Sequence, residues 1–343
     1  MKDFAVFHQV IDALTEGTAY VLGLAANVVI RPNSFISVWM LTVTLLIAVL
    51  WYRHGGRKPR SWRVLRRALF PRHHLTGRSA RADWVMTGLG HVLFTTTIVV
   101  SFLGLATLAA SVKYSLTALT GTSHLIALPA FAAAAITTVV AFLAYEFAYW
   151  LDHWLKHHVP FLWHFHKVHH TAETLSPLTN FRLHPIDGYL FAALTGTATG
   201  LAIGLCGWLI GDAALPFEVN GGNLILIVCA YLVISLQHTH VWLPFTGRLG
   251  RWLLSPAHHQ VHHSADPRHY NSNYGSVLAL FDRLFGTLRV PTRASPRLRF
   301  GVNDLNHDPH SLAGLYLVPV RDALAELAPQ QPAPRPGGVK QTA

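Results

Sequence analysis

Residues 153–170 read HWLKHHVPFLWHFHKVHH, and the histidines in this stretch recur at the spacing of a helix. Its end, His166-Lys-Val-His169-His170, carries histidines at positions i, i+3 and i+4. The segment His259-Gln-Val-His262-His263 repeats this pattern about ninety residues later. Such positions share one face of a helix, so each triplet is predicted to direct three imidazoles to a common point. His153 and His157 have the i, i+4 spacing and add two more.

These histidines have the chemistry of metal ligands. Imidazole is the commonest nitrogen ligand of transition metals, and its neutral form binds them near pH 7. Eight histidines on three short segments exceed what one ion can coordinate, so we predict a binuclear metal centre. For an isolated histidine, such as His8 or His124, the expectation is instead an ordinary residue with a hydrogen-bonded ring.

The composition indicates a membrane protein. Of the 343 residues, 51% are hydrophobic and only 13% are charged, whereas about a quarter is charged in soluble proteins. A membrane-spanning helix needs about 20 residues. Apolar stretches of about this length, the last of them shorter, occupy 35–52, 84–110, 125–144, 189–210 and 223–236. We therefore predict an all-α polytopic bundle of about four to five spans. The apolar segment 14–30 is predicted to be an interfacial helix or a further span, not a removed signal peptide.

The net charge of +11 has an uneven distribution that argues against nucleic-acid binding. Ten Lys and Arg residues and no acidic residue lie between 53 and 82, directly after the first expected span. Short basic loops beside spans stay in the cytoplasm and attract anionic headgroups. Counting the spans from this loop brings both histidine triplets to the cytoplasmic side, in a helical cap. Cys206 and Cys229 lie in apolar stretches, so neither a disulfide framework nor a thiolate zinc site is expected.

The ordered motifs resemble a known family. The stretch from Tyr149 to His170, the stretch Ser255-Pro-Ala-His-His259-Gln-Val-His262-His263-Ser264, and the following Asn271-Ser-Asn-Tyr274-Gly resemble the signature of the sterol desaturase/fatty acid hydroxylase superfamily. The resemblance covers roughly 85–290. Members are integral membrane enzymes whose histidines hold two irons that activate O₂ to hydroxylate or desaturate lipids.

The resemblance implies a ligand set. His238, in Gln237-His238-Thr-His240, matches the single histidine that this family places between the two boxes. His184 lies in an Arg-x-His-Pro-x-acid element and is assigned as a ligand, with the alternative that it caps the turn before Pro185. His240 stands where relatives often have Asn, and could be an outer partner or a ligand. The predicted ligands are therefore His153, His157, His166, His169, His170, His184, His238, His259, His262 and His263.

Carboxylates are few around these motifs, unlike in soluble di-iron enzymes, which rely on Glu. An all-imidazole shell is neutral and leaves the charge of the metals less compensated, which favours oxidising chemistry. Nearby acids are expected to orient imidazole N–H groups from outside the ligand set. For Glu146 a plain buried hydrogen bond is as reasonable, and for Asp282 we favour a structural pair with a basic neighbour. The acids concerned are Glu146, Asp152, Glu173, Asp187, Asp266 and Asp282.

The resemblance thus implies an oxygenase, and its electrons are expected to come from a separate carrier. No nucleotide-binding glycine motif is present, so a ferredoxin- or cytochrome-type carrier with its reductase is expected. The predicted setting is the bacterial cytoplasmic membrane, and the predicted substrate is a sterol, fatty acyl, carotenoid or polar lipid. The alternatives are another lipid oxidase on the same scaffold, for ether-lipid cleavage or for ornithine-lipid or carotenoid hydroxylation, and a metal transporter or storage protein. A transporter would place ligands near mid-membrane, whereas these histidines lie at segment ends.

Three regions are expected along the chain. Residues 1–82 would form the N-terminal membrane helix or helices and the basic cytoplasmic loop. Residues 83–295 would form the catalytic membrane domain that carries all the predicted ligands. Residues 296–343 would form a C-terminal extension, of which the Pro/Gly-rich part 329–343 is predicted to be disordered.

Overall fold

The computed structural model describes residues 29–31, 34, 37–54, 61–303 and 305–328, the side chains of 91–103 excepted. The predicted helix at 14–30 lies almost entirely outside these residues, and the predicted disordered tail lies outside them altogether.

Helices form nearly all the regular structure of the described residues, which confirms the predicted all-α class. The exception is a hairpin of two short antiparallel strands, β1 (Glu218–Val219) and β2 (Gly222–Asn223). Asn220 and Gly221 between them have φ of 49° and 77°, as a two-residue hairpin turn requires. Asn223 then begins helix α9 (Leu224–Leu232), because its side chain accepts hydrogen bonds from the first free amides of that helix.

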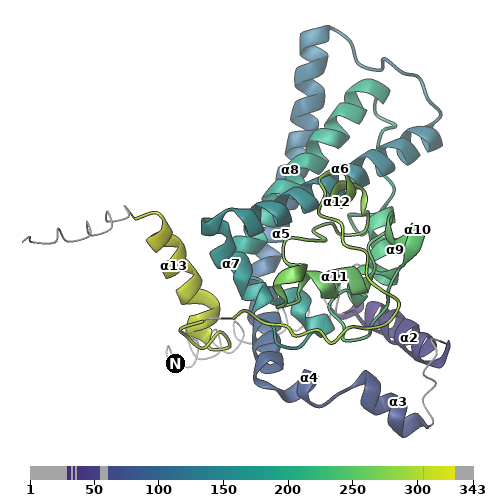
Figure 1. The fold of residues 1–343 in the computed structure, drawn as a ribbon. Coiled ribbons are helices and arrows are strands. Elements are labelled where there is room, and N and C mark those ends of the chain that lie inside the picture. The colour runs from purple at the N-terminus through teal and green to yellow at the C-terminus, as the bar shows by residue number, and fades with distance from the viewer. Residues whose placement is uncertain (1–28, 32–33, 35–36, 55–60, 304, 329–343) are drawn as a thin grey trace, which may run out of the picture.

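Three long helices form the bundle that carries the rest of the molecule: α5 (Arg78–Thr120), α6 (Ala130–His158) and α8 (Pro185–Ile210). Helix α8 packs along both α5 and α6, and α5 and α8 extend side by side away from the shorter helices (Figure 1). Helices of 26 to 43 residues are long enough to bring their ends out of a bilayer core.

Glycines on α8 explain how closely α5 approaches it. A Cβ atom at Gly200 would lie 3.0 Å from the carbonyl oxygen of Leu105, and one at Gly204 would lie 2.7 Å from that of Ala109. The two glycines are four residues apart and so lie on one face of the helix. Such small-residue faces are typical of helix pairs in membranes, where close backbone approach replaces the hydrophobic driving force.

Two of the described helices are long and apolar enough to cross a membrane, namely α6 and α8. Helix α2 (Val38–His54) and the segment Leu224–Leu236 are apolar but shorter. The last segment is interrupted, because α9 ends at Leu232 and a 3₁₀ turn, η2 (Ile234–Leu236), follows it. The described helices therefore support two candidate spans, fewer than the four to five that the sequence predicts.

Short helices pack at one end of the bundle and form the predicted cap. Helix α7 (Pro160–His170) follows α6 after a single extended residue, Val159, since the ring of Pro160 stops α6 and begins a new helix. The other short helices of this end are η1, α10, α11, η3 and α12, of which α10, α11 and α12 are labelled in Figure 1. Their bounds are Pro177–Phe181, Gly247–Gly250, Pro256–His262, Pro267–His269 and Leu280–Leu284.

The remaining helices flank the cap. Helices α3 (Trp62–Leu69) and α4 (His73–Thr76) carry the basic loop, and Leu65 and Leu69 of α3 pack against a cluster that includes Leu236 and Leu243. At the C-terminus, a π-helical turn, η4 (Ala313–Leu317), leads into α13 (Val318–Glu326). Helix α13 packs against α7, the helix of the first histidine triplet (Figure 1).

Candidate metal centre

Four elements bring the predicted ligands together at the end of the bundle. The last two turns of α6 carry His153 and His157, α7 carries the first triplet, and α11 with its C-terminal residue carries the second. His238 follows the 3₁₀ turn that ends the α9 segment. Both triplet helices begin with proline, at Pro160 and Pro256, whose fixed φ suits the first helical position.

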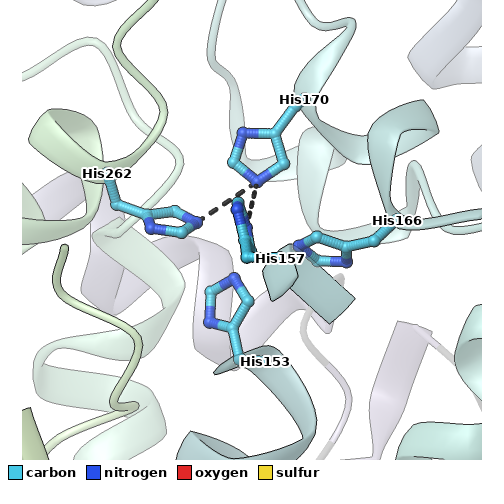
Figure 2. A group of neighbouring side chains, drawn as sticks. All are labelled: His153, His157, His166, His170 and His262. Carbon is cyan, nitrogen blue, oxygen red and sulfur yellow. Dashed lines mark hydrogen bonds between the residues drawn. The ribbon is translucent and has the colours of Figure 1, made fainter. Parts of the chain in front are cut away.

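The histidines form two groups. Group one consists of His153, His157, His166, His170 and His262, whose nitrogens all lie within 4.8 Å of one another. Figure 2 shows their imidazoles turned toward one central point. The Nε2 atom of His170 lies 3.1 Å from that of His157 and 3.2 Å from that of His262.

Group two is made of His169, His238, His259 and His263, with nitrogens again within 4.8 Å of one another. The Nε2 atom of His238 lies 2.8 Å from that of His259, 3.0 Å from that of His169 and 3.1 Å from that of His263. The groups adjoin, since the rings of His170 and His263 stack with centroids 4.5 Å apart.

Each triplet contributes to both groups, which corrects the prediction that its three imidazoles meet at one point. From α7, His166 and His170 join group one while His169 joins group two. From α11, His259 and His263 join group two while His262 joins group one. Helical residues are rotated by roughly 100° each, so positions i and i+4 differ by only about 40° whereas i+3 and i+4 diverge by about 100°. The i, i+4 pair therefore stays together and the i+3 residue crosses to the neighbouring group.

Hydrogen bonds from outside the groups orient the rings. In group one, Nδ1 of His153 donates to the carbonyl of Tyr274 at 2.8 Å, and Nδ1 of His262 donates to that of Ser272 at 2.8 Å. The third ring, His166, donates to Asp187 at 3.2 Å. In group two, His238 donates to Oδ1 of Asn180 at 2.8 Å. A ring whose Nδ1 carries the proton presents a bare Nε2 lone pair, as a metal ligand must.

These geometries fit metal ions. The Nε2 atoms of His153 and His166 are buried and have no hydrogen-bond partner among the described residues, which is costly unless something else satisfies them. Nitrogen ligands at roughly 2.1 Å from one ion lie roughly 3.0–3.4 Å from each other. The Nε2 separations of 2.8 to 3.2 Å within the groups are close to this range.

Burial also keeps the rings neutral in the metal-free chain. Removal from water lowers the pKa of His238 and of His262 to about 3, because the charged imidazolium loses its hydration. The same cause holds the pKa of His169, His170, His259 and His263 well below the usual value. At neutral pH these rings are free bases with a lone pair to donate.

The carboxylates near the groups have three kinds of partner: a ring of group one, backbone amides, and other side chains. Asp187 contacts His166 directly. Asp282 accepts from the amides of Tyr274 and Gly275 at 2.9 and 2.8 Å, not from a basic neighbour as expected. In the same way Glu146 accepts from two backbone amides, of Val277 and Leu278. Of the remaining acids, Asp152 pairs with Lys156 and Asp266 with Arg268, while Glu173 contacts the ring of His310.

His184 and His240 lie outside both groups. The Nδ1 atom of His184 accepts the amide of Ile186, so the ring caps the start of α8, while Nε2 donates to the carbonyl of Tyr316. With both nitrogens engaged, the ring has no lone pair for a metal, in agreement with the capping alternative. His240 donates Nε2 to the carbonyl of Ala68 at 2.7 Å and joins the basic loop to the cap.

Sequence reasoning missed several residues that hold the rings. Tyr274 and Ser272 act through backbone carbonyls, which carry no side-chain signal, and Asn180 lies in a short 3₁₀ helix without a motif. Tyr274 does belong to the motif Asn271-Ser-Asn-Tyr274-Gly, and its ring also packs edge-on or tilted against His153, His157 and His262.

Comparison with known proteins agrees with this geometry. Residues 138–287, which include both groups, match the family described as fatty acid hydroxylase. The match covers 150 of the 343 residues, so the likeness is to this segment and not to the whole chain. The resemblance inferred from the histidine motifs is thereby confirmed, and lipid hydroxylation and desaturation are the chemistry of the hydroxylase relatives that the chain resembles.

Several curated proteins are similar to this segment. The ornithine lipid hydroxylase of Rhizobium tropici is 31% identical over 47% of the chain and 44% of its own length. A Δ7-sterol 5(6)-desaturase of Gibberella zeae is 28% identical over 46% of the chain and 43% of its own. The alkylglycerol monooxygenase of Homo sapiens is 26% identical over 44% of the chain and 30% of its own. The chain thus spans less than half the length of these relatives. No solved structure gave a significant match.

Proposed function

We propose that the chain is an integral membrane di-iron oxygenase that uses O₂ and external electrons to hydroxylate or desaturate a C–H bond of a lipid. The observation that carries the proposal is the pair of adjoining groups of buried, neutral imidazoles at the end of a helical bundle. A neutral ligand set leaves the charge of bound metal ions uncompensated, and that favours oxidising chemistry over simple storage.

Two irons per chain are the proposed cofactors, one at each group. The family supports iron as the metal, since imidazole alone would also accept zinc or copper. The proposed ligands are His153, His157, His166, His170 and His262 for group one and His169, His238, His259 and His263 for group two. His184 is left out because its ring nitrogens are engaged elsewhere. When bound, the iron pair would supply the oxidising power that breaks the lipid C–H bond.

The chain's own residues prepare the site for this chemistry. The carbonyls of Tyr274 and Ser272 and the side chains of Asp187 and Asn180 hold four rings in the tautomer that leaves Nε2 free. Eight of the nine histidines are buried, and His157 is partly buried. This burial keeps most water away from the site, which limits the unproductive loss of oxidising equivalents to solvent.

We further propose a membrane topology of four to five spans with both groups on the cytoplasmic side. Helices α6 and α8 supply two spans, and the apolar parts of α2, α5 and the α9 segment supply the others. The basic loop 53–82 supports the cytoplasmic assignment, and a bacterial cytoplasmic membrane is the proposed location. In this scheme residues 1–82, 83–295 and 296–343 are the membrane anchor, the catalytic domain and a C-terminal extension.

The proposed substrate is a membrane lipid, and the relatives named above act on an ornithine lipid, a sterol and, by their name, alkylglycerols. Each hydroxylation consumes O₂, two electrons and two protons and releases one water. A ferredoxin- or cytochrome-type carrier with its reductase would supply the electrons.

A metal transporter is the main alternative of another class. A transport site is expected near the middle of the spanning helices, at broken segments that can open to either side. Here the two groups lie at the last turns of α6 and in the short helices of the cap. This placement favours a fixed catalytic cofactor.

The proposal predicts two irons per chain and loss of product without them. Protein reconstituted anaerobically in detergent should hold two irons, whereas His262→Ala, which removes a group-one ring, should hold fewer. A host that produces the active protein should accumulate lipids with one added oxygen or two fewer hydrogens, and the His262→Ala host should not. Metal and lipid contents would be measured by elemental analysis and mass spectrometry.

His307→Ala is the matched control, because His307 is only partly buried, belongs to neither group and hydrogen-bonds its neighbour Asn306. It should bind iron and make product like the unaltered chain. One metal per chain in carefully loaded protein would rule out the binuclear assignment.

A further inference from the structure

Lys156 is a lysine buried in the last turns of α6, with only 3% of its surface exposed. Burying an ammonium group is costly unless it is paired and hydrogen-bonded. Its Nζ lies 2.6 Å from Oδ2 of Asp152, one turn earlier on the same helix, and forms an ion pair with Oδ1 of Asp187. It also donates to the backbone carbonyl of Asp187 at 3.0 Å. Asp187 is thus held at two points by one cation.

The other oxygen of Asp187 leads to the metal centre. Oδ2 accepts the Nδ1 proton of His166 at 3.2 Å, and His166 belongs to group one. Lys156, Asp187 and His166 therefore form a chain of direct contacts that ends at a bare Nε2 atom. Helix geometry separates the two roles of α6, because His153 and His157 point into group one while Asp152 and Lys156 lie on the adjacent face.

The charges around Lys156 are unequal. Two carboxylates face one ammonium, so Asp152, Lys156 and Asp187 together carry a net charge of −1 beside a set of neutral rings. No other Lys or Arg among the described residues pairs with either carboxylate. Without Lys156, both acids would be left buried beside each other without a cation, and Asp187 would lose what fixes its orientation.

We propose that Lys156 is a positioning residue of group one: it holds Asp187 so that Asp187 orients His166 toward the metal. The proposal rests on the proposed function only in that group one binds a metal. Group two lies outside this series of contacts, because the ring of its residue His238 is held by Asn180. Loss of Lys156 should therefore weaken one of two metal sites and leave the other intact.

The test is a metal titration of the metal-free full-length protein in detergent, with Co²⁺ as the spectroscopic probe. In the unaltered chain we expect two equivalents to bind, with absorption bands for each. Lys156→Met should lower the affinity for one equivalent by about 10- to 100-fold, the usual effect of losing an outer partner, and should leave the second unchanged. A general structural defect would instead weaken both.

Two further variants separate positioning from charge and from folding. Asp152→Asn keeps the Lys156–Asp187 pair and should retain both affinities. Asp187→Asn, nearly the same in shape, should reproduce the loss even if Lys156→Met does not fold. The double variant Lys156→Met/Asp187→Asn should lose no more than either single one, since the three groups act in series.

Lys113→Met is the matched control, because Lys113 also pairs with an aspartate, Asp212, but near the far end of α5. It should bind two equivalents as the unaltered chain does. Two unchanged affinities in both Lys156→Met and Asp187→Asn would overturn the inference while leaving the proposed function standing. Failure of the unaltered chain to bind two equivalents would instead count against the proposed function itself.

Discussion

At the scale of single residues, the metal centre depends on groups that never face it. Asp282 is fully buried and accepts three hydrogen bonds, from the amides of Tyr274 and Gly275 and from the hydroxyl of Thr287 at 2.6 Å. These bonds fix the loop whose carbonyl at Tyr274 orients the ring of His153. A carboxylate outside the histidine groups therefore helps to set the direction of a ring inside them, that of a proposed ligand.

Replacing Asp282 should be among the more damaging single changes outside the ligands. Asp282→Ala leaves two buried amides without their acceptor, and we expect a loss of at least about 3 kcal/mol in the free energy of unfolding. The measurement is thermal or denaturant unfolding in detergent. Asp322→Ala removes an aspartate paired with the exposed Arg321, and should change stability by less than about 0.5 kcal/mol. Equal stability of the two variants would show that the loop does not need Asp282.

At the scale of the elements, some features could be predicted from the sequence and others could not. The histidine spacing predicted which helices bring histidines together, and helical periodicity requires their grouping in i, i+4 pairs. The crossing of His169 and His262 to the opposite group depends on how α7 and α11 face each other, which no local pattern encodes. For His184, the Arg-x-His-Pro-x-acid pattern is compatible with a metal ligand and with a helix cap. The carbonyl of Tyr316, which accepts from His184, is far away in sequence and is brought near only by the fold.

Span prediction from hydropathy shows a similar limit. The stretch 223–236 is apolar throughout, but its helix ends at Leu232 and a 3₁₀ turn follows, so that His238 can reach group two. The mean hydropathy of a segment does not report where its backbone leaves the helix. In the sequence, His238 follows this apolar stretch directly, and a potential metal-binding residue at that position indicates that the stretch also contributes to the site.

The contact between α5 and α8 gives a prediction for the bundle. A methyl group added at Gly204 would lie 2.7 Å from both the carbonyl oxygen of Ala109 and Cβ of Val112. Gly204→Ala should therefore force α5 and α8 apart and destabilise the protein by about 1–3 kcal/mol. Unfolding in detergent, compared with the unaltered chain, measures this effect.

Gly104→Ala is the matched control on α5, where an added Cβ would meet nothing within 4 Å. The better helix propensity of alanine should leave this variant equally or slightly more stable. A Gly204→Ala protein as stable as Gly104→Ala would mean that close packing of α5 on α8 contributes little to the bundle.

At the scale of the whole molecule, the distribution of charge and of histidines makes a testable statement about sidedness. The basic loop packs onto the cap, through the contact of His240 with Ala68 and of His74 with the carbonyl of Leu175. The loop and the two histidine groups must therefore lie on the same side of the membrane. The proposed topology puts that side in the cytoplasm.

Reporter fusions after Arg67 and after Ser264 should both report the cytoplasm. Alkaline phosphatase activity, which needs an oxidising compartment, should be low at both positions, and a fluorescent protein that folds in the cytoplasm should be bright at both. A fusion after Ser123, which follows the far end of α5, provides the opposite result as the control. Different sides for Arg67 and Ser264 would contradict the contacts between the loop and the cap.

The position of His169 in group two and of His262 in group one has a consequence for the stability of the protein. Each proposed ion would take ligands from both α7 and α11, so each would tie together two segments of the chain that lie far apart in sequence. Such a tie closes a long loop, and it restricts the unfolded chain in the way a disulfide does. Because both ions would close the same loop, either ion alone should already hold α7 against α11. Protein that carries a single ion should therefore resist unfolding better than the metal-free protein does.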